Sequence, residues 1–107
     1  MARAPHDLVA AGFLADLLAT HPDEQIRDGC EASDLAARVS LAYDHKDANT
    51  LLIWATAQAE NGQWDDAVVT ARKGLRLARQ EQRKLLAREF RHRMEMFKQE
   101  IPYHDGD

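Results

Sequence analysis

The residues with the clearest potential for chemistry lie between two apolar stretches, in the segment LLATHPDEQIRDG at positions 17–29. His21 is followed there by Asp23, Glu24 and Asp28, and such a set could bind a metal ion or serve in acid–base catalysis. A zinc site needs further nitrogen or sulfur ligands at fixed spacing, and this segment offers one histidine. Because proline and aspartate are typical turn residues, we interpret the segment as a long turn whose acidic side chains face water.

Two other places carry groups that could do chemistry. Glu89 and His92 form one E-x-x-H unit, of which a di-iron site in a helical bundle needs two copies. Cys30 is close to an expected helix start, but no basic residue or histidine adjoins it, and we expect it to be buried or half-buried. The sequence has no glycine-rich phosphate loop and no metalloprotease or serine hydrolase motif. We therefore expect no catalytic residue, no metal and no cofactor.

Length and composition favour one helical domain over residues 1–107. A chain of 107 residues that is 45% hydrophobic and 30% charged, with five glycines and three prolines, can bury a core without disulfides or metals. No segment alternates polar and apolar residues as a half-buried strand does. One cysteine cannot form an intramolecular disulfide, which fits a reducing cytoplasm. The longest apolar run, residues 8–15, is too short to cross a membrane.

Hydrophobic periodicity predicts about five helices in an all-α fold. The first ends before Pro22, and the second follows Gly29. The third begins after Asp47, a good capping residue, and ends at Gly62. The fourth covers about 64–78, and the fifth about 81–98, with no glycine or proline between the two. The apolar stripe of the fifth comprises Leu86, Phe90, Met94, Phe97 and Ile101.

Charge is distributed unevenly along the chain. Residues 1–71 carry 4 basic and 12 acidic side chains, residues 72–98 carry 10 basic and 3 acidic ones, and the last nine residues carry 3 acidic ones. The net charges of these regions are −8, +7 and −3. In the middle region the basic residues recur at spacings of three and four, so they could form a positive helical face. This basic face comprises Arg72, Arg76, Arg79, Arg83, Arg88 and Arg91.

Residues 48–78, ANTLLIWATAQAENGQWDDAVVTARKGLRLA, resemble one tetratricopeptide repeat, which is a pair of antiparallel helices. The family places a large and a small residue together in the first helix, a glycine at the turn, and an aromatic residue where the second helix starts. These places are held here by Trp54, Ala55, Gly62 and Trp64. Gln58 departs from the pattern, in which tyrosine is usual, and Gly74 replaces an alanine.

The resemblance extends to both sides of this repeat. The segment RHRMEMFKQEIPYHD is similar to the closing helix and Pro-Tyr tail after the last repeat of bacterial tetratricopeptide proteins. The resemblance implies an α-solenoid fragment with repeat 1 at about 6–44, an extended turn at 21–29, repeat 2 at about 48–78, a closing helix at about 81–98 and a tail at 99–107. Solenoids generally need about three repeats, so either the closing helix completes the core or the N-terminal helix meets a partner, and we expect self-association through that helix.

The family resemblance implies a non-catalytic scaffold that binds a peptide or helix of a partner protein. The first helix of each repeat would line the groove, at positions that include Asp16, Asn49, Leu52, Thr56 and Glu60. No lysine or arginine occupies these positions, which favours an uncharged or basic ligand over a terminal carboxylate. The alternative is a nucleic-acid-associated accessory protein that uses the basic face 72–91. The net charge of −4 and the lack of interleaved aromatic residues disfavour it.

Overall fold

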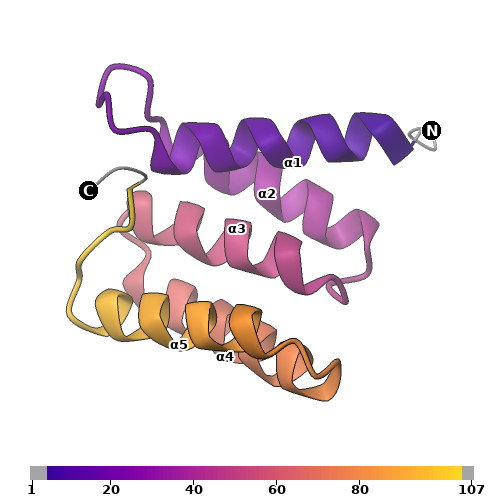
Figure 1. Ribbon diagram of the computed structural model, residues 1–107. Helices are drawn as coiled ribbons and strands as arrows, with labels where there is room; N and C mark the ends of the chain where they lie inside the picture. Colours follow the sequence, from indigo (N-terminus) through magenta and orange to yellow (C-terminus); the bar gives the residue numbers. More distant parts are fainter. Residues whose placement is uncertain (1–4, 105–107) are drawn as a thin grey trace.

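The computed structural model describes the backbone of residues 5–104 and the side chains of residues 9–104; residues 1–4 and 105–107, which the expected domain and tail include, lie outside the described residues. This range holds five helices and no strand: α1 (Pro5–Thr20), α2 (Gly29–Ala42), α3 (Ala48–Glu60), α4 (Trp64–Gln80) and α5 (Lys84–Lys98). Successive helices run antiparallel, with α1, α3 and α5 side by side and α2 and α4 behind them (Figure 1). The predicted all-α fold of about five helices is confirmed. None of the described helices is both long and apolar enough to span a membrane.

Aspartate side chains define the starts of α2 and α3. The Asp28 carboxylate accepts a hydrogen bond from the backbone N–H of Glu31 at 3.1 Å. Asp47 accepts in the same way from the backbone N–H of Thr50 at 3.0 Å, as predicted for the start of α3. Each bond satisfies one of the N–H groups that a helix start leaves without a partner in the helix. Both helices therefore begin where their local sequence favours it.

The helices α2 to α5 end in a left-handed residue, but only one of these residues is glycine. Gly62 follows α3 with a φ of 76°, as its sequence position predicted, and Gln82 follows α4 with a φ of 58°. Asp44 after α2 and Glu100 after α5 adopt similar angles. Because Gln82 reverses the chain, α5 begins at Lys84 rather than near residue 81 as expected, and α4 and α5 are separate helices.

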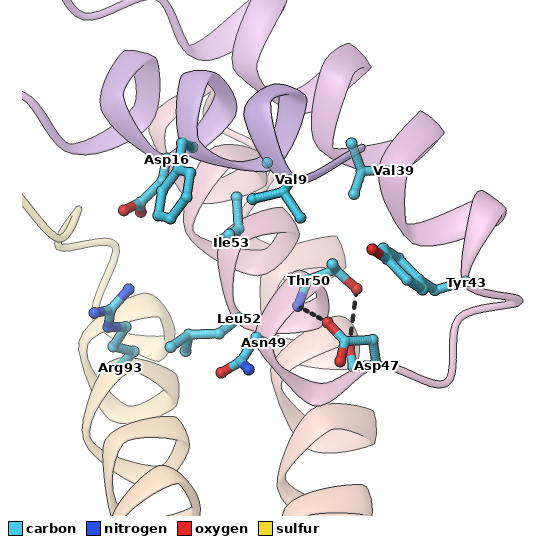
Figure 2. Close-up of a pocket in the computed structure, with 12 residues that line it drawn as sticks. Val9, Asp16, Val39, Tyr43, Asp47, Asn49, Thr50, Leu52, Ile53 and Arg93 are labelled. Atoms are coloured by element: carbon cyan, nitrogen blue, oxygen red, sulfur yellow. Dashed lines mark hydrogen bonds between the residues drawn. The ribbon is translucent and has the colours of Figure 1, made fainter. Parts of the chain in front are cut away.

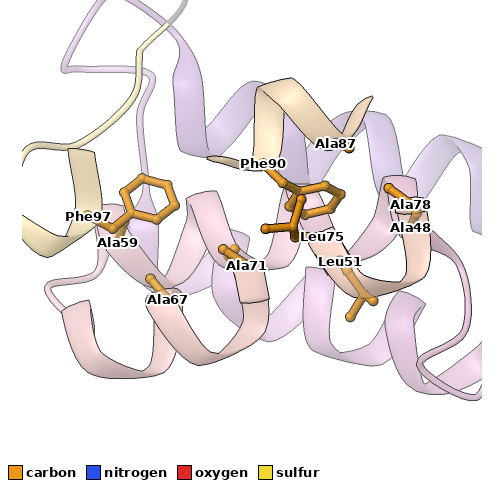
Figure 3. Packing of buried hydrophobic residues seen from close by; sticks show 11 residues of the cluster. Ala48, Leu51, Ala59, Ala67, Ala71, Leu75, Ala78, Ala87, Phe90 and Phe97 are labelled. Carbon is orange, nitrogen blue, oxygen red and sulfur yellow. The ribbon is translucent and has the colours of Figure 1, made fainter. Parts of the chain in front are cut away.

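The main core lies between α3, α4 and α5 (Figure 3). Phe90 and Phe97 of α5 are fully buried against small side chains, which let α3 and α4 approach closely. The predicted stripe on α5 is correct at these two residues and at Leu86 and Met94, which pack against the same core, and wrong at Ile101, which is exposed because α5 ends at Lys98. The fully or nearly fully buried members of this cluster are Ala48, Leu51, Ala55, Ala59, Ala67, Ala71, Leu75, Ala78, Ala87, Phe90 and Phe97.

Close packing against α5 explains why position 74 of α4 is a glycine. It is buried, and a Cβ atom added to it would overlap with the ring of Phe90 on α5. Phe90 is fully buried, so its ring could move away only by displacing neighbouring core side chains. The loss of helix propensity at Gly74, about 1 kcal/mol relative to alanine, is therefore offset by room for an aromatic ring.

Replacing Gly74→Ala should lower the free energy of unfolding by about 1–2 kcal/mol, because overpacking outweighs the gain in helix propensity. Urea denaturation measures this change. The double variant Gly74→Ala with Phe90→Leu, in which the ring is gone, should be less destabilised than the sum of the two single variants. A Gly74→Ala protein as stable as the parent chain would contradict this packing.

Gln58 of α3 is a buried polar residue. It occupies the position where tyrosine is usual in the tetratricopeptide repeat that residues 48–78 resemble. Its Oε1 atom is buried and has no hydrogen-bond partner among the residues that the structure describes. A buried acceptor without a partner costs about 1–3 kcal/mol. The core between α3 and α4 is therefore less stable than its apolar content suggests.

Replacing Gln58→Met, which keeps the length of the side chain and removes the amide, should raise the free energy of unfolding by about 1 kcal/mol. Gln80→Met, at the exposed end of α4, is the matched control and should leave the free energy of unfolding within about 0.5 kcal/mol of the parent value. A decrease at Gln58→Met would mean that its amide is hydrogen-bonded in solution.

Candidate functional site

A groove with a volume of about 420 Å³ opens on the side of the molecule where α1, α3 and α5 lie together. α1 and α3 contribute most of its apolar wall, and α5 contributes Arg93 (Figure 2). α2 and the turn after it add Val39, Tyr43 and Asp47, so residues of four helices line one surface. The lining residues are Val9, Gly12, Phe13, Asp16, Val39, Tyr43, Asp47, Asn49, Thr50, Leu52, Ile53 and Arg93.

The structure places three of the five expected groove residues in this lining. Asp16 comes from α1, and Asn49 and Leu52 come from α3. Thr56 is buried one turn further along α3, and Glu60 lies at the end of that helix, beyond the groove. The side chains of Thr56 and Glu60 accept hydrogen bonds that hold neighbouring segments in place.

Arg93 is the main residue of this site that sequence reasoning missed. Its Nε donates to Glu89 Oε1 at 2.7 Å, and its Nη1 donates to Thr56 Oγ1 at 3.0 Å. The guanidinium carbon lies 3.7 Å from the centre of the Tyr103 ring, and the Arg93 side chain is 11% exposed. The spacing of Glu89 and Arg93 is a visible helical (i, i+4) pair, but nothing in the sequence points to Thr56 or Tyr103.

Glu60 binds two segments that lie far from it in the sequence. Its Oε1 accepts a hydrogen bond from Arg27 Nε at 2.9 Å, and its Oε2 accepts one from His104 Nε2 at 2.6 Å. The side chain of Glu60 is 15% exposed. A carboxylate held by two donors away from water is a strong structural tie. Glu60 therefore joins α3 to the loop before α2 and to the C-terminal tail.

Apart from Arg27, which binds Glu60, the hydrogen-bonded side chains of the loop 21–28 bind the loop itself or the start of α2. The Nδ1 atom of His21 accepts from the Asp23 N–H, Asp23 Oδ1 accepts from the Gln25 N–H, and Asp28 caps α2. No group of three or more His, Cys, Asp or Glu residues suited to a metal ion occurs among the described residues. The geometry is that of a folded turn, as interpreted from the sequence.

Ser40 and His45 form a pair that resembles a nucleophile and its base. Their Oγ and Nδ1 atoms are 2.8 Å apart. Ser40 is fully buried, and the imidazole ring is stacked on Trp54 with ring centres 5.3 Å apart. A substrate cannot reach the hydroxyl, so this pair fixes the turn between α2 and α3 rather than performing chemistry.

The other predicted positions lie on exposed surfaces. Cys30 is exposed, contrary to expectation, because it is the second residue of α2 and points away from the buried alanines of that helix. His92 is exposed, and its neighbour in the E-x-x-H unit, Glu89, is bound to Arg93. These residues form no shared site.

The predicted basic face is divided between two helices and their turn. Arg72, Arg76 and Arg79 are exposed on α4, and Arg88 and Arg91 are exposed on α5. In the turn, Arg83 lies 3.7 Å from Glu81 and also donates to Asn49. Within residues 9–104, the five arginines on the helices form no ion pair. Their charge is therefore available to a partner.

Comparison with known proteins gives this chain no relative. No protein-family model, no curated protein and no solved structure matches the sequence or the fold. Any assignment of function therefore rests on the residues and geometry of the chain itself.

Proposed function

We propose that this protein is a non-catalytic interaction module that binds a peptide or helix of a partner protein in the groove lined mainly by α1 and α3. The observation that carries the proposal is the groove itself, because residues of four helices line one concave surface. The resemblance of residues 48–78 to a tetratricopeptide repeat supports it, since the corresponding helices line the groove in that family. The one cysteine fits action in a reducing cytoplasm.

The chemistry of the groove indicates the kind of ligand. Val9, Phe13 and Leu52 offer apolar contacts, and Asp16 and Asp47 add negative charge. Complementary charge steers association and excludes unsuitable partners more than it adds affinity. We therefore expect a ligand segment with apolar side chains and basic or neutral polar ones.

Arg93 does not make the groove a receptor for a terminal carboxylate. Its guanidinium already binds Glu89 and Thr56 and lies over Tyr103. The Glu89 carboxylate already offsets the charge of Arg93, so the guanidinium attracts a second carboxylate less than an unpaired arginine would. This arrangement supports the preference for ligands without acidic groups.

Nucleic acid binding by the basic face remains the alternative function. Its exposed arginines could contact phosphates. However, Phe90 and Phe97 of α5 are fully buried, so this helix offers neither ring as a platform for stacking bases. We therefore favour the groove.

A phage-displayed library of random peptides tests the groove, with selected peptides titrated by fluorescence polarisation. We expect the selected peptides to be rich in apolar and basic residues. Leu52→Arg should weaken their binding at least about tenfold, or about 1.4 kcal/mol. Asn49→Trp, at an exposed position in the same groove, should also weaken binding by filling the space.

Val69→Arg is the matched control, because Val69 is exposed on α4 and does not line the groove. This variant should bind the selected peptides as the parent chain does. Unchanged binding by both groove variants, or acidic peptides from the selection, would refute the proposed function.

A further inference from the structure

The helical stack has an open side at each end. α3 packs against helices on both sides, whereas α1 contacts α2 and α3, and α5 contacts α4 and α3 (Figure 1). Each terminal helix therefore has a surface that no described part of the chain covers. The residues on these two surfaces differ in a way that bears on what could cover them.

The open side of α1 is apolar. α1 packs inward through small residues, such as Ala15 and Ala19, and leaves larger apolar side chains outside. Leu14 is 44% exposed and Leu17 is 47% exposed, and Phe13, which also lines the groove, is 71% exposed. A helix that buries its alanines and exposes a row of larger side chains is typical of a contact surface.

Acidic residues lie close to the open side of α1. Asp23 and Glu24 are exposed in the loop that follows α1. Residues 9–42, which include this loop and α2, carry six acidic and two basic side chains. An approaching surface with positive charge would be attracted to this end of the molecule.

The open side of α5 is basic around one apolar residue. Leu85 is 77% exposed, and Arg88 and His92 follow it at helical spacing on the same side. Arg88 and Arg91 form no ion pair within residues 9–104. α5 itself carries five basic and two acidic side chains. This end therefore complements the α1 end in charge and shares with it an exposed apolar group.

Charge decides how two copies can meet. A symmetric contact through α1 would place acidic surroundings against each other, and one through α5 would place arginine against arginine. A head-to-tail contact pairs the opposite charges instead. We propose that the α1 end of one copy binds the α5 end of a second copy, so that copies associate in a head-to-tail series. The apolar surfaces are small, so the association is weak and transient.

Sedimentation velocity over a range of protein concentrations tests this contact. At low salt the mass of the parent chain should rise with concentration beyond that of a dimer. At about 1 M salt, where the Debye length falls to about 3 Å, the association constant should fall at least about tenfold. A parent chain that stays monomeric at every concentration would overturn the proposal.

Two variants test the direction of the contact. Leu17→Glu blocks the α1 end and Leu85→Glu blocks the α5 end; both residues are exposed and neither lines the groove, so folding and peptide binding should be retained. Each variant alone should be monomeric. Their equimolar mixture retains one intact contact and should form a one-to-one dimer that grows no further.

A symmetric contact would behave differently in the same experiment. If Leu85→Glu alone still associates while Leu17→Glu does not, the contact joins two α1 ends and the head-to-tail proposal is wrong. Val69→Glu, on the exposed side of α4, is the matched control and should associate as the parent chain does. Because Leu17 and Leu85 lie outside the groove, a negative result here leaves the proposed peptide binding untouched.

Discussion

The carboxylate of Glu60 is the interaction on which the geometry of this protein most depends. It lies at the last residue of α3 and binds Arg27 from the loop before α2 and His104 from the C-terminal tail. At 15% exposure it is shielded from water, so its bonds are stronger than those of a surface ion pair. Removing either donor would leave a partly buried charge short of partners, which is costly.

The backbones of α2 and α3 also lie close together at this junction. Gly29, the first residue of α2, lies so near the end of α3 that an added Cβ would be 2.7 Å from the carbonyl carbon of Glu60. Arg27 also donates to the carbonyl oxygen of His21 at 3.0 Å, so the long loop is folded against the same junction. The loop 21–28, which first suggests a reactive site, instead supplies the arginine that fastens α2 to α3.

The tail extends this junction to the groove. His104 holds the tail at Glu60, Tyr103 lies under the guanidinium of Arg93, and Arg93 reaches Thr56 on α3. These side chains join α3 and α5 in addition to the core that holds α5 through Phe90 and Phe97. The position of Arg93 at the groove follows from this chain of contacts.

Regular features were predictable from the sequence because they depend on near neighbours. Helical periodicity, the Asp47 cap and the Gly62 turn are local, and each was found as expected. Gln82 adopts the same left-handed conformation as Gly62 without the residue that marks it, so the start of α5 was misplaced. Local propensity cannot reveal such a turn when packing of the flanking helices imposes it.

The candidate site was predictable only in part, for a related reason. Asp16, Asn49 and Leu52 follow from the expected faces of two helices. Glu60 and Arg93 depend on partners 33, 44 and 37 residues away in sequence. Without aligned relatives, no pattern in one chain pairs Glu60 with Arg27 and His104. Those pairings appear only once the fold brings the segments together.

A double-mutant cycle between Arg27 and Glu60 tests the central role of this carboxylate most directly. The free energies of unfolding of Arg27→Ala, Glu60→Ala and the double variant should reveal an interaction energy of at least about 1 kcal/mol. The exposed pair of Lys98 and Glu95, 3.3 Å apart, serves as the reference and should give less than about 0.5 kcal/mol. Additive effects at Arg27 and Glu60, within about 0.3 kcal/mol, would show that this tie does not hold the structure together.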